Sequence, residues 1–203
     1  MQQLRTMLEL QDSMNTKVHA EWRSQGFDWH RAIWIECGEL MDHYGWKWWK
    51  KQIPDVPQVE LELIDIWHFG LSVLLQSGMA ADEIVKKIEA ELVIASDEPD
   101  FRVDLESFAE LTLRTKGFDV AAFARLMAGI GMSFEQLFVG YVGKNVLNFF
   151  RQDHGYQDGS YVKMWAGKED NEHLVEALVE LDASQASFSD DLYKALEARY
   201  QQA

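Results

Sequence analysis

The chain of 203 residues carries 34 acidic and 19 basic side chains, a formal net charge of −15 and a pI of about 4.7. This excess of acid argues against a general nucleic-acid-binding protein and against a polybasic membrane anchor, because both need clustered lysine and arginine. The single cysteine, Cys37, forms no intrachain disulfide, and the N-terminal stretch is not typical of a secretion signal. We expect a cytoplasmic protein with neither a nucleic-acid nor a membrane partner.

Apolar residues recur at spacings of three and four through most of the chain, which is the helical period. In the first half, this pattern predicts helices over residues 2–23, 28–45, 59–77 and 82–95. The helix over 59–77 is apolar on nearly every side, so we expect it at the centre of the fold. Pro54 and Pro57 indicate the loop that precedes it. The segment 96–100, SDEPD, is typical of a linker.

In the second half, helices are predicted over 101–116, 119–129 and 133–152. The last of these is opened by a capping box of Ser133 and Gln136. A loop rich in glycine and tyrosine follows, and two acidic amphipathic helices close the chain. No convincing alternating strand pattern is present. The sequence therefore predicts an all-α fold, an antiparallel helical bundle that forms a single domain over residues 1–203.

Two pairs of acidic residues lie in apolar helical surroundings. Glu36 and Glu39 are three apart in IWIECGEL, and Glu62 and Asp65 are three apart in VELELIDIWHFGLSVLL. This spacing is about as frequent as chance predicts in so acidic a chain, so only the surroundings distinguish these pairs. Half-buried carboxylates repel one another unless they pair with a base or bind a metal. If the two helices pack antiparallel, four carboxylates converge, and such ligands suit Mg²⁺ or Mn²⁺.

Basic residues form two groups in a chain that is otherwise poor in them. The segment WKWWKK (residues 46–51) contains Lys47 and Lys50, and the downstream group consists of Lys144, Arg151, Lys163 and Lys168. Lysines near a carboxylate cluster could simply neutralise it. Cations and metal-binding carboxylates together suit a polyphosphate substrate. The three tryptophans of WKWWKK fit either the core or the border of a base pocket, and we favour the core.

Five segments follow one another in a specific order: LQDSMN (10–15), ECGELMDHYGWKWWK (36–50), ELIDIWHF (62–69), KNVLNFFRQDHGY (144–156) and GSYVKMWAGKEDN (159–171). Together they resemble the dimeric all-α dUTPases, which belong to the all-α NTP pyrophosphatases. The metal signature of that family is E-x-x-E followed at a distance by E-x-x-D. It falls on Glu36, Glu39, Glu62 and Asp65.

The resemblance implies a dUTP diphosphatase that hydrolyses dUTP to dUMP and pyrophosphate, accepts dUDP as well, and so limits uracil in DNA. It implies two or three Mg²⁺ ions on the four carboxylates, Mn²⁺ as a substitute, and a homodimer. By analogy, Glu36 or Glu39 orients the attacking water and takes its proton. The phosphate contacts are then assigned to Lys47, Lys50, Lys144, Arg151, Lys163 and Lys168.

Base recognition is assigned mainly to amides, because an amide group matches the donor and acceptors of a uracil edge. Gln11 and Asn15 are four apart, so they share a face of the first helix. Each could equally be an ordinary surface or capping residue. The other candidates for the base and sugar are His68 as a nucleoside contact, Phe69 as a stacking ring, and Asn145 and Asn148.

Three alternative functions stay open at this point. A phage-type enzyme of the same fold cleaves dCTP as well as dUTP, since a flipped amide accommodates cytosine. A non-enzymatic helical adaptor would use the acids as surface and the aromatics as an interface, and a nucleoside monophosphate phosphohydrolase would release free phosphate. Residues 80–132 match none of the five segments, and we expect them to cap the site or to pack a dimer.

Overall fold

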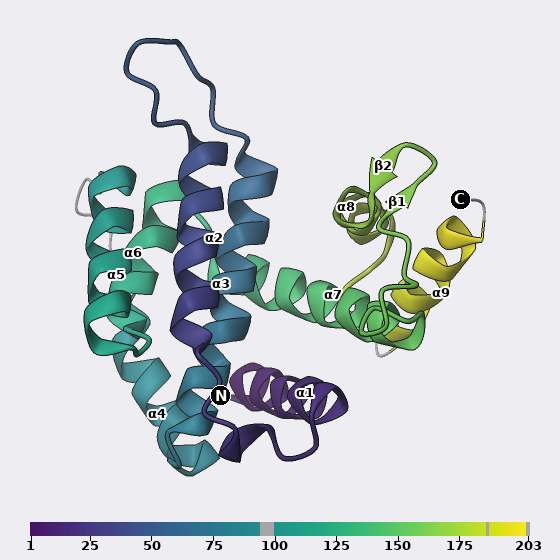
Figure 1. Cartoon of the computed structure of the whole chain (residues 1–203), viewed down its shortest axis with the longest axis horizontal. Helices are drawn as coiled ribbons and strands as arrows, with labels where there is room; N and C mark the ends of the chain where they lie inside the picture. Colours follow the sequence, from purple (N-terminus) through teal and green to yellow (C-terminus); the bar gives the residue numbers. More distant parts are fainter. Residues whose placement is uncertain (94–99, 186, 202–203) are drawn as a thin grey trace. The chain divides into compact units, whose positions relative to one another are not determined.

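The computed structural model describes residues 1–93, 100–185 and 187–201, and these are helical over most of their length (Figure 1). The prediction of an all-α fold is confirmed. Residues 96–99 of the predicted linker lie outside the described residues. The elements are α1 (Gln2–Val18), η1 (Trp22–Ser24), α2 (Trp29–Tyr44), α3 (Val56–Gln76), α4 (Ala81–Glu91), α5 (Phe101–Thr115), α6 (Val120–Ile130), α7 (Phe134–Asp153), β1 (Met164–Trp165), β2 (Lys168–Glu169), α8 (Asp170–Glu180) and α9 (Phe188–Tyr200).

The chain divides into two compact units, Met1–Leu137 and Phe138–Ala203, with the division inside α7. The single-domain organisation stays a prediction. None of the helices in the described ranges is both long enough and apolar enough to cross a membrane.

The first unit is built around α3, as its all-round apolar sequence predicts. Val59, Leu63, Ile66 and Leu71 of this helix have no exposed surface, and α3 packs against α1, α2, α4 and α6. Each such side chain contributes roughly 1.5–3 kcal/mol through its burial. The helix begins at Val56, three residues before the predicted start, because the Asp55 carboxylate accepts a hydrogen bond from the Gln58 N–H and caps it.

The first helix ends five residues earlier than predicted. At His19 the backbone is extended (φ −152°, ψ 113°), and the chain turns back on α1. This turn buries Trp22, whose indole Nε1 donates a hydrogen bond of 3.1 Å to the Asp12 carboxylate. Burial of the large indole against α1 thus overrides the continuing helical period.

Residues 80–132, which the sequence left without a motif, supply an aromatic layer over α3. Trp67 of α3 stacks on Phe123 with 5.1 Å between ring centroids, and meets Phe118 edge-on at 5.8 Å. Phe108 contacts both of these phenylalanines. The described part of this region is therefore core of the first unit, and a role as a cap or in a dimer stays a prediction.

The second unit contains a two-stranded antiparallel sheet that the sequence did not predict. Strands β1 and β2 pair Met164 with Glu169 and Trp165 with Lys168. The two-residue turn between them holds Ala166 and Gly167 at positive φ. A type I′ hairpin turn requires positive φ at both of its central residues. Each strand has only two residues, which is too short for an alternating pattern to be visible in sequence.

A glycine allows the aromatic layer to approach α3 closely. A Cβ at Gly70 would lie 2.6 Å from Cε2 of Phe118, whereas a Cβ at Gly38 of α2 would meet nothing within 4 Å.

We expect Gly70→Ala to lower the free energy of unfolding by about 1–3 kcal/mol through overpacking. Gly38→Ala, the matched control, should be neutral or raise it by up to about 1 kcal/mol, through better helix propensity. Urea denaturation of both variants checks this, and equal stability of the two would refute the close packing at Gly70.

Candidate active site

Three carboxylates converge between α2 and α3, which run antiparallel as neighbours in Figure 1. One carboxylate oxygen from each of Glu36, Glu62 and Asp65 lies within 4.8 Å of the others. Glu62 is buried, with 8% of its surface exposed, and the other two are half-buried. The antiparallel packing therefore brings together three of the four carboxylates predicted to bind metal.

The cluster is electrostatically unfavourable when it carries its full negative charge. Burial, the nearby charge of Asp65, and the hydrogen bond and charge of Glu62 raise the pKa of Glu36 to about 9. His43 Nε2 lies 3.5 Å from Glu62 Oε1, at the edge of the cluster. The cluster therefore favours an added positive charge, which is either a proton or a cation. Three hard oxygen ligands at this spacing fit a divalent cation such as Mg²⁺.

Glu39, the fourth predicted ligand, lies one turn further along α2. Its side chain is exposed, and the three-carboxylate cluster does not include it. Its charge nevertheless contributes to the raised pKa of Glu36. Glu39 thus lies near the cluster, and its role as a ligand or base stays a prediction.

A buried relay of hydrogen bonds joins α1 to α3. His68 Nδ1 lies 2.8 Å from Gln11 Oε1, and Gln11 Nε2 donates to Asn15 Oδ1 at 3.0 Å. Asn15 Nδ2 donates to Ser72 Oγ at 2.9 Å. The structure thus brings together three of the predicted base-binding residues, all of them buried. Ser72 was missed by sequence reasoning, although its place four residues after His68 put it on the same face of α3.

The three tryptophans of WKWWKK are exposed, so our preference for core positions is wrong. Trp46, Trp48 and Trp49 are 45%, 89% and 57% exposed. Gly45, at φ +94°, ends α2. The loop that follows projects beyond the ends of α2 and α3 (Figure 1). The indoles pack edge-on against one another rather than into the core.

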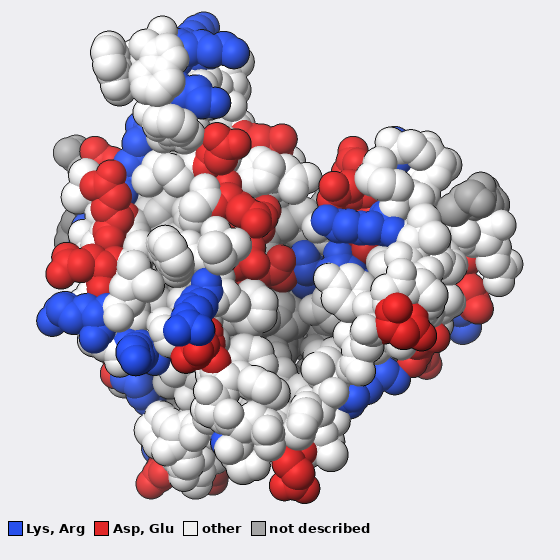
Figure 2. Space-filling model, in the orientation of Figure 1, with Lys and Arg blue, Asp and Glu red and all other residues white. Residues whose placement is uncertain are grey.

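The same loop presents the first group of lysines. Figure 2 shows basic side chains at its tip and acidic side chains gathered over α2 and α3. Lys47 Nζ lies 3.9 Å from the Asp42 carboxylate and over the Trp46 ring. Lys50 is exposed.

A sequence model of the dUTPase family matches residues 3–156 of the chain. The chain belongs to the dUTPase family. It is therefore a nucleoside triphosphate pyrophosphohydrolase with dUTP diphosphatase-type activity, and the adaptor and nucleoside monophosphate alternatives are wrong. Enzymes of the dUTPase family generally use a divalent metal, which agrees with the carboxylate cluster. No curated protein matches the chain.

The family match contains the three clustered carboxylates and the relay, and it ends before Lys163 and Lys168. In the second unit, Lys163 Nζ forms an ion pair of 2.9 Å with Glu169, and Lys168 pairs with Glu176. Both pairs are exposed enough for solvent to compete with them. The predicted phosphate contacts at these two lysines therefore rest on the sequence alone.

Arg151 is paired with a buried carboxylate in the second unit. Its guanidinium donates two hydrogen bonds, of 2.8 and 2.9 Å, to the buried carboxylate of Asp170. Burial alone would raise the pKa of Asp170, but the hydrogen bonds and charge of Arg151 lower it below the usual value. Asn148 Oδ1 accepts from Arg151 Nη1, and Lys144 Nζ donates to Asn171 Oδ1 at 3.0 Å.

The remaining base and sugar candidates are a half-buried ring and a buried amide whose nitrogen has no hydrogen-bond partner within the described residues. Phe69 is half-buried and stacks on Trp29, with 6.2 Å between ring centroids. Asn145 is buried in α7. A stacking role for Phe69 and a base or sugar contact for Asn145 stay predictions.

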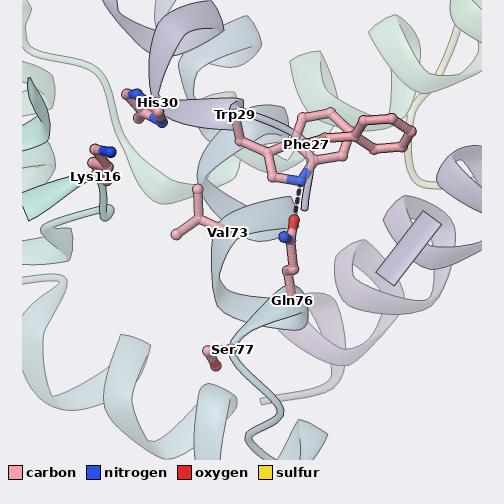
Figure 3. A pocket seen from close by; sticks show the side chains of 7 residues that line it. All are labelled: Phe27, Trp29, His30, Val73, Gln76, Ser77 and Lys116. Carbon is pink, nitrogen blue, oxygen red and sulfur yellow. Dashed lines mark hydrogen bonds between the residues drawn. The ribbon is translucent and has the colours of Figure 1, made fainter. Parts of the chain in front are cut away.

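A separate cavity of about 280 Å³ lies where α2 begins and α3 ends (Figure 3). The Trp29 indole at its wall donates a hydrogen bond to Gln76 Oε1. None of the predicted site residues lines this cavity, so it is distinct from the carboxylate cluster. Its walls are Phe27, Trp29, His30, Val73, Gln76, Ser77 and Lys116.

The raised pKa of Glu36 predicts how stability depends on pH without added metal. Burial and the neighbouring carboxylates raise the pKa of Glu36 to about 9 in the folded protein, whereas its ordinary value is 4.5. The folded state thus binds more protons between these values, so the free energy of unfolding should fall as pH rises through them. We expect Glu36→Gln to flatten this dependence.

Thermal denaturation across this pH range, in EDTA and in Mg²⁺, measures the effect. Mg²⁺ should restore stability to the unsubstituted protein at the alkaline end. Glu106→Gln, which removes an exposed acid on α5, is the control and should keep the original pH dependence. An unchanged slope in Glu36→Gln would show that this residue is not the group that holds the proton.

Proposed function

We propose that the chain is a Mg²⁺-dependent dUTP diphosphatase that acts in the cytoplasm as a homodimer. It converts dUTP to dUMP and pyrophosphate, and dUDP to dUMP and phosphate. The observation that carries this proposal is the convergence of Glu36, Glu62 and Asp65 in a member of the dUTPase family. The phage-type alternative keeps this site and adds dCTP as a substrate.

Glu36, Glu62 and Asp65 would hold Mg²⁺, with Glu39 completing the set from the next turn of α2. The raised pKa of Glu36 supports this, because the cluster is costly without a compensating charge. When bound, two or three Mg²⁺ ions, or Mn²⁺ in their place, would offset the negative charge of the phosphates.

Glu36 or Glu39 is the base that orients the attacking water and accepts its proton. A carboxylate is effective in this role only when it is ionised, and a neighbouring cation lowers the pKa of an acid that burial has raised. Glu39 is the more exposed of the two and reaches water directly.

The proposed substrate contacts comprise polar and aromatic side chains for the base and sugar, and cations for the phosphates. Gln11, Asn15 and His68 would contact the base, Phe69 would stack on it, and Asn145 and Asn148 would contact base or sugar. The phosphate contacts would be Lys47, Lys50, Lys144, Arg151, Lys163 and Lys168. Arg151, Lys163 and Lys168 are already paired with carboxylates. On binding, each would either leave its carboxylate for a phosphate or contact both.

A product assay tests the proposed function. The purified protein is incubated with each dNTP in Mg²⁺ or EDTA, and the nucleotides and pyrophosphate are resolved. We expect dUMP and pyrophosphate from dUTP in Mg²⁺ only. Glu62→Gln should lower kcat at least about 100-fold by weakening the metal site, while the circular dichroism spectrum is kept. Near-normal turnover by Glu62→Gln would remove this residue from the site.

Lys163 can be tested separately because its partner is known. If Lys163 contacts phosphate, Lys163→Ala should raise KM several-fold by removing a charge-assisted hydrogen bond. Glu169→Gln, the matched control, breaks the same exposed ion pair without removing the cation, and should leave KM unchanged or lower it. Steady-state kinetics with dUTP measures kcat and KM for both variants. Unchanged kcat and KM in Lys163→Ala would show that Lys163 is a surface residue without a phosphate contact.

A further inference from the structure

The hydrogen-bond relay between α1 and α3 ends at Ser72, whose hydroxyl direction is set by a bond to the main chain. The Ser72 hydroxyl donates a hydrogen bond of 3.0 Å to the main-chain carbonyl of His68. A carbonyl oxygen only accepts, so this bond leaves the lone pairs of Ser72 Oγ to receive a donor. Asn15 Nδ2 provides it at 2.9 Å. Ser72 thereby determines which end of the Asn15 amide faces α3.

The orientation of Asn15 passes along the relay. With Nδ2 on Ser72, Oδ1 of Asn15 faces Gln11 and accepts its Nε2 N–H at 3.0 Å. Gln11 then presents Oε1 to His68 Nδ1 at 2.8 Å, which requires the proton on that nitrogen. Reversing one amide therefore requires reversing the other and changing the imidazole tautomer.

Burial makes this coupling effective. Ser72 has no exposed surface, and Gln11, Asn15 and His68 are each at most 6% exposed. Water is therefore poorly placed to replace a bond that a reversed amide would lose. A buried polar group without its partner costs about 1–3 kcal/mol, which disfavours a relay with one member reversed.

The direction of an amide decides which pyrimidine edge it matches. Uracil presents a donor at N3 and an acceptor at O4, whereas cytosine presents an acceptor at N3 and a donor at its amino group. An amide that offers oxygen to N3–H and N–H to O4 fits uracil, and the same amide reversed fits cytosine.

We propose that Ser72 is a positioning residue that holds the Gln11 and Asn15 amides in one direction and thereby favours uracil over cytosine. This rests on the proposed function, in which these amides contact the base. Ser72 belongs to a polar stripe on α3, since Glu62, Asp65, His68 and Ser72 follow at spacings of three, three and four. The stripe begins at the metal-binding carboxylates and ends at the group that directs the relay.

The first test compares kcat/KM for dUTP with kcat/KM for dCTP. We expect Ser72→Ala to lower this ratio about tenfold, because the Asn15 amide then loses the acceptor that sets its direction. Ser72→Thr keeps the hydroxyl and should keep the ratio. Ser107→Ala, the matched control, removes a hydroxyl that makes the same bond four residues back, to the Val103 carbonyl on α5. It should leave the ratio unchanged.

The second test uses no substrate. In ¹⁵N NMR spectra at mildly alkaline pH, the neutral His68 ring should carry its proton on Nδ1, and Ser72→Ala should shift it toward a mixture of tautomers. His68→Gln assigns the signal. This measurement reports the direction of the relay even if the ratio falls for another reason.

The outcomes separate the inference from the function on which it rests. If the unsubstituted protein hydrolyses dUTP but Ser72→Ala keeps both the ratio and the Nδ1 tautomer, the positioning role is wrong and the proposed function stands. If the unsubstituted protein does not hydrolyse dUTP, the proposed function is wrong and the specificity role of Ser72 falls with it.

Discussion

Repulsion among three carboxylates at the contact between α2 and α3 is the constraint on which the rest of the site depends. Glu36, Glu62 and Asp65 place acid oxygens within 4.8 Å of one another in a partly dehydrated position. A proton on Glu36, whose pKa is raised to about 9, relieves part of this repulsion, and the apolar residues around the cluster hold the two helices together. Burial of the α3 core offsets the repulsion, and a bound cation would remove it.

The same helix that forms the core also carries the polar stripe of the site. Thirteen of the 21 residues of α3 are buried, and among them are Glu62, His68 and Ser72. A helix packed on four sides has little freedom to rotate or shift, so its polar side chains keep their relative positions. A well-packed core is thus what allows the carboxylates and the amide relay to be preorganised.

In the second unit, the predicted phosphate-binding cations Arg151, Lys163 and Lys168 are paired with carboxylates. Arg151 is held by two hydrogen bonds to a buried carboxylate, and Lys163 and Lys168 pair with glutamates near the surface. Removing Arg151 would leave the buried Asp170 charge without its guanidinium partner and with the Tyr161 hydroxyl as a remaining donor, so a loss of activity on its substitution would report on folding as well as on binding. The exposed lysines are better tests of phosphate contact for this reason.

The sequence by itself determined the helical class, the central position of the helix predicted over 59–77, and the acidic pairs from which the carboxylate cluster is built. Spacings of three and four are local, so they predict helices without knowledge of the tertiary contacts. Sequence reasoning was wrong where a tertiary contact competed with the local pattern. Trp22 turns back onto α1 and shortens it, and the WKWWKK tryptophans extend into solvent because Gly45 ends α2.

Only the tertiary structure decided which polar residues meet. The three carboxylates come from two helices. The packing angle and register of those helices bring one oxygen of each carboxylate to within 4.8 Å of the others. Gln11 and Asn15 could be paired with each other from their spacing, but Ser72 lies 57 residues from Asn15, and no local pattern connects them. The direction of a buried hydrogen bond depends on which groups the fold places in contact, and that contact is decided by the packing of α1 against α3.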